Sequence, residues 1–183
     1  MAWARAARLE EQHDVAISWM PYELHPEIPD GGQINNRRFT AIAKLAAEME
    51  LPFLAPKKFR PTRRAHQAVL LMDYIKPANT PLLMNRMFEA IWVEELDIES
   101  PEILFELMSD SEIPADVVQR VVLSDELKPA IGVSVRKALE WGITGTPSWV
   151  IDNKLMVPGL QEDDFFDRVI AKLAANRAET LER

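Results

Sequence analysis

The chain has 183 residues with 29 acidic and 21 basic side chains, which gives a formal net charge of −8 at pH 7. It contains no cysteine, and this excludes thiolate nucleophiles, disulfide exchange and thiolate-bound metal centres as its own chemistry. Its apolar runs are too short to cross a membrane, and its acidity disfavours nonspecific nucleic-acid binding. We therefore expect a soluble, cytoplasmic protein that binds neither membranes nor nucleic acids.

The first part of the chain predicts a helix, a strand and a long loop. An alanine-rich helix is expected over residues 2–12, and its mixed charges leave no apolar signal-peptide core. Apolar residues that alternate with small ones predict a strand over residues 15–19. Several prolines and an Asp-Gly-Gly turn predict an extended loop over residues 20–33.

Helical spacing dominates the middle of the chain, and strand patterning returns near its end. Apolar residues recur every three or four positions, which predicts five or six helices near residues 36–49, 65–75, 80–92, 100–108, 114–122 and 126–141. Two short β-rich runs flank an Asp-Asn-Lys turn, which predicts a hairpin of residues 148–151 and 155–157. A closing helix is expected to begin near Glu162. Strands at both ends with helices between them favour one α/β sheet interrupted by a helical insertion.

A basic cluster precedes the second predicted helix of this middle region. It consists of Lys57, Lys58, Arg60, Arg63 and Arg64. Such runs are most often solvated helix faces, and the alternative is a basic pocket for a carboxylate or phosphate ligand. His66 is either a structural histidine or part of that anion site. No metal site is predicted, because the three histidines lack metal-ligand spacing.

The segment Gly-Ile-Thr-Gly-Thr-Pro at residues 142–147 is the sharpest local motif. It leads directly into the predicted hairpin. If the Thr146–Pro147 bond is cis, the backbone N–H and C=O of Thr146 face outward, and an extended peptide could pair with them by strand addition. From the residues alone, a trans proline at the start of an ordinary strand is the commoner arrangement and stays the alternative.

These motifs, in this order, resemble the DsbA-like thioredoxin family. The stretch from Trp141 to Leu173, with its Thr-Pro, Ser-Trp-Val-Ile-Asp-Asn-Lys and Gly-Leu-Gln segments, is similar to the C-terminal half of such a domain. Trp-Met-Pro-Tyr-Glu-Leu-His-Pro at residues 19–26 is similar to the second strand and loop of the FrnE-type branch. The resemblance implies an α/β, thioredoxin-like fold, truncated at its N-terminus, over residues 1–35 and 142–183, with an all-helical insertion over residues 36–141.

Two departures from the family bear on function. The family's redox Cys-x-x-Cys would fall on Met1, Ala2, Trp3 and Ala4, so both sulfurs are missing and thiol–disulfide exchange is not expected. The strand that should precede the first helix is also missing. Its two neighbours could pair directly, a second copy could fill the gap, or the natural start could lie upstream. We also expect that the chain can form a homodimer, because an incomplete sheet exposes strand edges that can pair with a second copy.

The resemblance also implies a binding site beside a cis proline at Pro147. We expect a redox-inactive groove that binds an extended peptide or a small thiol ligand. Its expected residues are Thr146, Pro147, Trp3, Pro21, His66, Arg63 and Arg64.

The alternative is a glutathione-dependent isomerase or transferase. The chain also resembles the kappa-class glutathione transferases and the 2-hydroxychromene-2-carboxylate isomerases, which use glutathione with a serine near the position of the first cysteine. The first serine here is Ser18, on the predicted strand, so that role has no occupant. The thiol of bound glutathione would replace a protein cysteine, with residues 57–64 holding the glutathione carboxylates. The sequence thus leaves two interpretations, a glutathione-dependent enzyme and a binding protein without redox activity.

Overall fold

The computed structural model describes residues 1–181, without the side chains of Asp163 and of residues 178–181. The chain forms two compact units. One, here called the thioredoxin-like unit, consists of Met1–Met20 and the chain from Trp141 onward, and the other, the helical unit, consists of Pro21–Glu140. Residues 182 and 183, at the end of the predicted domain, lie outside the described part of the chain.

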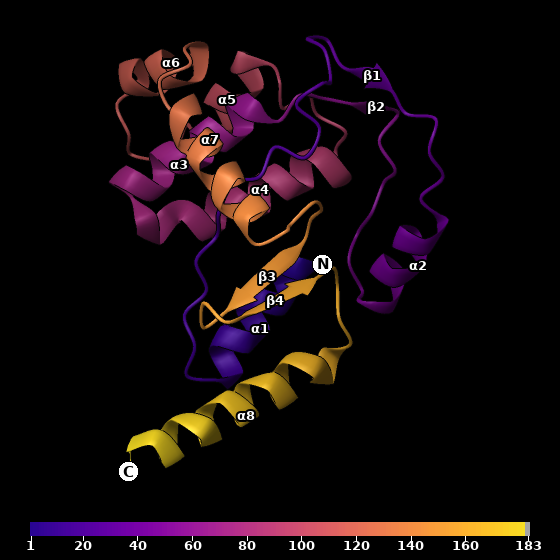
Figure 1. Ribbon diagram of the computed structural model, residues 1–183. Coiled ribbons are helices and arrows are strands. Elements are labelled where there is room, and N and C mark those ends of the chain that lie inside the picture. Colours follow the sequence, from indigo (N-terminus) through magenta and orange to yellow (C-terminus); the bar gives the residue numbers. More distant parts are fainter. Residues whose placement is uncertain (182–183) are drawn as a thin grey trace. The chain divides into compact units, whose positions relative to one another are not determined.

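The thioredoxin-like unit contains two helices and one hairpin (Figure 1). The helices are α1 (Ala2–Gln12) and α8 (Asp163–Leu181), and the strands are β3 (Ser148–Ile151) and β4 (Leu155–Pro158). Asp152 and Asn153 both have positive φ and Lys154 donates to the Ile151 carbonyl, which makes the tight turn that suits a twisted hairpin. The predicted helix, hairpin and closing helix are confirmed.

The predicted strand over residues 15–19 is wrong. The segment carries no ladder pairing, although its burial still alternates between partly buried Val15 and Ile17 and exposed Ala16 and Ser18. A strand requires a hydrogen-bonded neighbour, and within the described residues β3 pairs only with β4. The two flanking segments therefore do not close the gap by pairing directly.

Aromatic and ionic contacts hold the helices and the hairpin of this unit together. Trp149 of β3 packs on Phe166 of α8, with ring centroids 4.8 Å apart. At the end of α1, Asp167 of α8 accepts from His13 at 2.7 Å and forms a longer ion pair with Arg8 at 3.4 Å. Leu9, Val157 and Phe166 are almost fully buried and form part of a small core.

The helical unit contains six α-helices, which confirms the predicted helical insertion. They are α2 (Thr40–Glu48), α3 (Arg63–Ile75), α4 (Thr80–Trp92), α5 (Pro101–Leu107), α6 (Ala115–Leu123) and α7 (Lys128–Glu140), with a 3-10 turn, η1 (Pro77–Asn79), before α4. Helices α3 to α6 enclose a core in which Ala68, Ala90, Leu104 and Val122 are fully buried. Ser100 caps α5 by accepting from the Ile103 N–H, followed by proline in the first turn.

Sequence analysis did not predict two short strands. β1 (Gln33–Ile34) pairs antiparallel with β2 (Lys58–Phe59), and the Asn35 N–H extends this contact by donating to the Lys57 carbonyl at 2.9 Å. This pairing holds residues 21–35 with the helical unit, whereas sequence analysis grouped them with the thioredoxin-like part. The predicted domain boundary at residue 35 itself stays a prediction.

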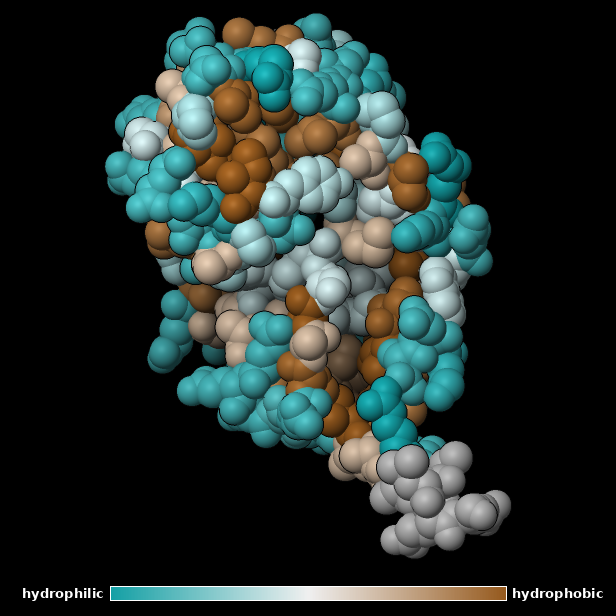
Figure 2. Space-filling view, turned by 90° about the vertical axis from the view of Figure 1, so that its left-hand side faces the viewer, coloured by the Kyte–Doolittle hydropathy of each residue, from teal (hydrophilic) through white to brown (hydrophobic). Residues whose placement is uncertain are grey.

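Hydrophobic side chains reach the surface of the helical unit at several places. Tyr74, Leu82 and Leu123 are each at least 60% exposed. Figure 2 shows hydrophobic side chains gathered among polar ones on one face of the molecule. No helix within the described residues is long and apolar enough to cross a membrane.

Candidate functional site

The candidate site begins at the entrance to β3. Thr146 is exposed, and the Thr146–Pro147 peptide bond is cis. The Pro147 carbonyl accepts from the Gly159 N–H at 2.7 Å, which extends the hairpin, and the Ser148 hydroxyl donates to the Gly145 carbonyl at 2.7 Å. The backbone N–H and C=O of Thr146, by contrast, make no hydrogen bond to any other described residue. A free donor and acceptor thus lie next to a strand with one unpaired edge.

A row of aromatic side chains runs through the same unit. The centroids of Trp3 and Trp19 are 5.0 Å apart, and those of Trp19 and Trp149 are 6.1 Å apart. The indole N–H of Trp149 is buried and has no hydrogen-bond acceptor among the described residues. Trp19 is 39% exposed, so the row offers apolar surface to a ligand.

The first turn of α1 is where sequence analysis predicts the family's redox motif to fall. Met1, Ala2, Trp3 and Ala4 supply a thioether, two methyl groups and an indole, and none of these is a nucleophile. Arg5, in the next turn, is buried and donates to the Gln161 carbonyl just before α8. The side chains of this turn therefore contribute packing contacts and no nucleophile.

The predicted basic cluster is largely engaged inside the helical unit. Arg63 pairs with Glu23 at 3.1 Å, Arg60 pairs with Asp97 at 2.9 Å, and Lys57 pairs with Glu95 at 2.8 Å. Arg64 donates to the Glu99 carbonyl at 3.0 Å. Three of the five cations are therefore already paired with carboxylates of the chain.

His66 is not available as a cation at neutral pH. Burial lowers the pKa of His66 to about 4, while a hydrogen bond to the Tyr22 backbone raises it by a smaller amount. Its ring is thus neutral and turned to a backbone group. This geometry favours the structural interpretation of His66 over the anion-binding one.

The predicted site residues are divided between the two units. Trp3, Thr146 and Pro147 belong to the thioredoxin-like unit, where Trp3 reaches β3 through the row of indoles. Pro21, Arg63, Arg64 and His66 belong to the helical unit. Their roles in binding stay predictions. Within the described residues, no three histidine, aspartate or glutamate side chains are grouped to hold a metal ion.

Sequence analysis missed one pocket in the helical unit. It lies between the loop before β1 and the β1–β2 pair, and its polar groups include His25 and Arg37. No periodicity or motif marks these residues, because the pairing of β1 with β2 that brings them together spans more than twenty positions of sequence.

A hairpin that follows a large helical insertion, together with a closing helix, is typical of a thioredoxin-like domain with an inserted helical unit. The model of the DSBA-like thioredoxin domain matches residues 1–171. The chain therefore belongs to the DSBA-like thioredoxin family. No curated protein matches it.

Solved structures share its fold at low sequence identity. A candidate DsbA oxidoreductase from Streptomyces coelicolor is similar with a TM-score of 0.80 and 19% identity, over 92% of this chain and 81% of that one. A candidate protein disulfide isomerase from Nitrosomonas europaea gives a TM-score of 0.72 and 16% identity, over 96% and 93%. A 2-hydroxychromene-2-carboxylate isomerase gives 0.69 and 15%, over 98% and 91%.

Proposed function

We propose that this DsbA-like domain binds an extended peptide at Thr146 and along β3 and does not exchange thiols. The observation that carries the proposal is the free backbone N–H and C=O of exposed Thr146, beside a strand paired on one side within the described residues. An extended peptide offers the complementary donors and acceptors, and it can add as a further strand. Such pairing gives affinity through the main chain and leaves sequence selectivity to neighbouring side chains.

The indole row supports the same proposal. A bound strand alternates its side chains between two faces, so one set can rest on apolar surface while the backbone pairs. Trp19 is exposed and stands next to Trp149 of β3, which places that surface close to the strand edge. Since the chain has no cysteine, the peptide would bind and leave without a mixed disulfide.

Amide hydrogen exchange at Thr146 tests this proposal. The probe is a capped, cysteine-free peptide of alternating valine and threonine, and its control is the same peptide with N-methylated backbone amides. We expect protection of the Thr146 amide by the first peptide and none by the second, because only the first can pair. Equal effects of the two peptides, or no protection by either, would contradict the proposal.

Reduced glutathione separates this proposal from the alternative, a glutathione-dependent isomerase or transferase. The ion pairs of Arg60 and Arg63 favour the peptide, because those cations already hold carboxylates of the chain. A ligand at 100 times its Kd adds about 2.7 kcal/mol of stability, which raises Tm by several degrees. We expect no such shift with glutathione. A clear rise in Tm would favour the glutathione-dependent activity instead.

A further inference from the structure

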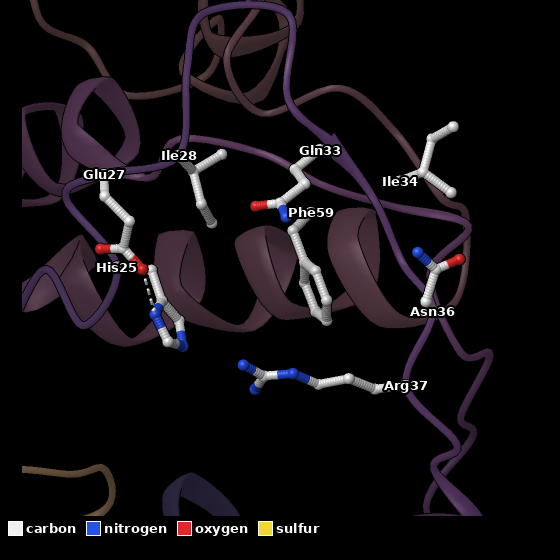
Figure 3. Close-up of a pocket in the computed structure, with 8 residues that line it drawn as sticks. All are labelled: His25, Glu27, Ile28, Gln33, Ile34, Asn36, Arg37 and Phe59. Carbon is white, nitrogen blue, oxygen red and sulfur yellow. Dashed lines mark hydrogen bonds and ion pairs between the residues drawn. The ribbon is translucent and has the colours of Figure 1, made fainter.

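A small pocket in the helical unit combines a cation with apolar walls. Its volume is about 150 Å³, smaller than the roughly 300–1,000 Å³ typical of pockets for larger ligands. His25, Glu27 and Ile28 come from the loop before β1, Gln33 from β1, Arg37 from the chain after it, and Phe59 from β2. Figure 3 shows the Phe59 ring and the Arg37 guanidinium pointing into the same space as the His25 imidazole.

Arg37 differs from the other cations near this pocket. Its guanidinium carbon lies 5.6 Å from the centroid of the Phe59 ring, which holds it by a cation–π contact. Lys57 and Arg60 are paired with carboxylates, whereas no carboxylate of the described residues forms an ion pair with Arg37. The fork of N–H donors on Arg37 is therefore open to an anion.

The pocket also contains one carboxylate, that of Glu27, which is bound to His25. Glu27 accepts from His25 Nδ1 at 2.9 Å, and Figure 3 shows this contact as a dashed line. A hydrogen bond from its own backbone and the bond from His25 lower the pKa of Glu27, with a small contribution from Arg37. The carboxylate is thus ionised and directed to the imidazole.

Hydrogen bonds hold the backbone that carries the pocket residues. The Asn35 side chain accepts from the Arg37 N–H at 2.8 Å and donates to the Pro56 carbonyl at 2.6 Å. The Gly31 N–H donates to both oxygens of Glu99, each at 2.9 Å. A preformed site loses less conformational entropy on binding than a mobile one.

We propose that this pocket binds a small monocarboxylate with an apolar body, such as an aromatic or branched acid. The carboxylate would lie on the Arg37 guanidinium in the bidentate arrangement that this fork favours. Ile28 and Phe59 would cover the apolar part, and Gln33 lines the same pocket. The pocket and Thr146 belong to different units of the chain, and this proposal does not depend on peptide binding at Thr146.

Binding of benzoate to the full chain, followed by NMR shifts of the amides of residues 31–37, tests the proposal. Benzamide, which has the same shape and no charge, is the control ligand. We expect benzoate to bind about tenfold more tightly than benzamide, because a hydrogen bond to a charged group is worth about that factor. Equal binding of the two, or no binding of benzoate at about 10 mM, would overturn the proposal.

Variants of the chain locate the site. Arg37→Gln should weaken benzoate binding about tenfold, and Arg37→Lys should weaken it less because the charge stays while the fork is lost. The neighbouring exposed residue supplies the control, since Arg38→Gln should leave binding unchanged. An unchanged circular dichroism spectrum for Arg37→Gln would show that the variant folds. A loss with Arg38→Gln as large as that with Arg37→Gln would contradict the assignment to Arg37.

Discussion

Gly31 and Gly32 show how one backbone position sets the shape of a site. Both have positive φ, +78° and +79°, which costs any other residue about 1 kcal/mol. They differ in space: a Cβ on Gly32 would lie 2.4 Å from the Phe59 carbonyl oxygen, whereas a Cβ on Gly31 would meet nothing within 4 Å. Only Gly32 therefore permits the close approach that pairs β1 with β2.

The substitution Gly32→Ala is accordingly expected to be more damaging than Gly31→Ala. Urea unfolding should give a loss of about 1 kcal/mol for Gly31→Ala, from backbone strain alone. Gly32→Ala should lose about 1–3 kcal/mol more, because the β2 backbone has to move. Equal losses for the two variants would mean that the β1–β2 pairing contributes little to stability.

His66 is expected to make stability depend on pH between about 6.5 and about 4. Burial lowers its pKa from 6.5 to about 4 in the folded state, so in this range the unfolded chain binds a proton that the folded chain does not. The stabilising effect is complete above pH 6.5 and is lost as the pH falls toward 4. We expect a decrease of about 1–3 kcal/mol in the free energy of unfolding.

The variant His66→Gln isolates this contribution, because it keeps an N–H that can donate to the Tyr22 carbonyl but cannot bind the proton. Urea unfolding at pH 7 and at pH 4.5 should show a smaller decrease for His66→Gln than for the unaltered chain. His25→Gln, a change of a more exposed histidine in the same unit, serves as the control and should leave most of the decrease in place, because it removes only the exposed contact with Glu27. An identical decrease in all three proteins would exclude His66 as its source.

Among the elements, α3 holds the connection between α6 and α7 through one buried side chain. Gln67 is 1% exposed, donates to the Ser124 carbonyl at 2.9 Å and accepts from the Leu127 N–H at 3.0 Å. These two bonds satisfy backbone groups that a helix end leaves free. A glutamine on the core side of α3 thus fixes a loop about sixty positions away.

Replacing Gln67 with an apolar side chain of similar size should lower the free energy of unfolding. Gln67→Leu leaves a carbonyl and an N–H without their partner, and each such group costs about 1–3 kcal/mol when buried. Because the loop is partly exposed, we expect a total loss of about 2 kcal/mol in urea unfolding. The same change at the exposed position Gln119, on α6, should alter stability by about 0.5 kcal/mol at most. A loss as small for Gln67→Leu would show that water satisfies both groups.

The contrast between helices and strands explains what the sequence could predict. A helix closes its hydrogen bonds within four residues, so apolar spacing identified all six helices of the insertion. The alternation at residues 15–19 has the period of a strand, but pairing depends on a partner that the described chain does not provide. The pair β1–β2 has two residues in each strand, too few for any period to be visible.

The candidate sites follow the same division. Thr146 and Pro147 stand in a local motif, and this motif, with the family resemblance, was enough to single them out. Arg37 and Phe59 meet only because β1 pairs with β2, so their pocket could not be found from either segment. Ion pairs such as Arg63 with Glu23 also join distant residues, which is why the basic cluster suggested an open anion site.

In the whole molecule, the two units have cores of unequal size. The large cluster of buried apolar side chains, from Ala65 to Val122, lies entirely within the helical unit. The thioredoxin-like unit has a hairpin with one unpaired edge among the described residues and fewer buried side chains. Since buried apolar area is the main source of stability, the thioredoxin-like unit should be the weaker of the two.

Two optical probes can follow the two units separately. Four of the five tryptophans, Trp3, Trp19, Trp141 and Trp149, belong to the thioredoxin-like unit, and Trp92 belongs to the helical unit. In the variant Trp92→Phe, tryptophan fluorescence therefore reports the thioredoxin-like unit alone. Far-UV circular dichroism reports mainly the helical unit, which contains six of the eight α-helices in the described chain.

We expect the fluorescence transition of Trp92→Phe to occur at a lower urea concentration than the circular dichroism transition, by about 1 M. With a slope of about 1–3 kcal/mol per molar urea, this separation corresponds to a difference of about 1–3 kcal/mol in stability between the units. The circular dichroism curve of the unaltered chain controls for the loss of the Trp92 ring, which packs against Phe53 at 5.7 Å. Coincident transitions would instead mean that the units unfold as one cooperative body, so that the β3–β4 hairpin is stabilised by the rest of the chain.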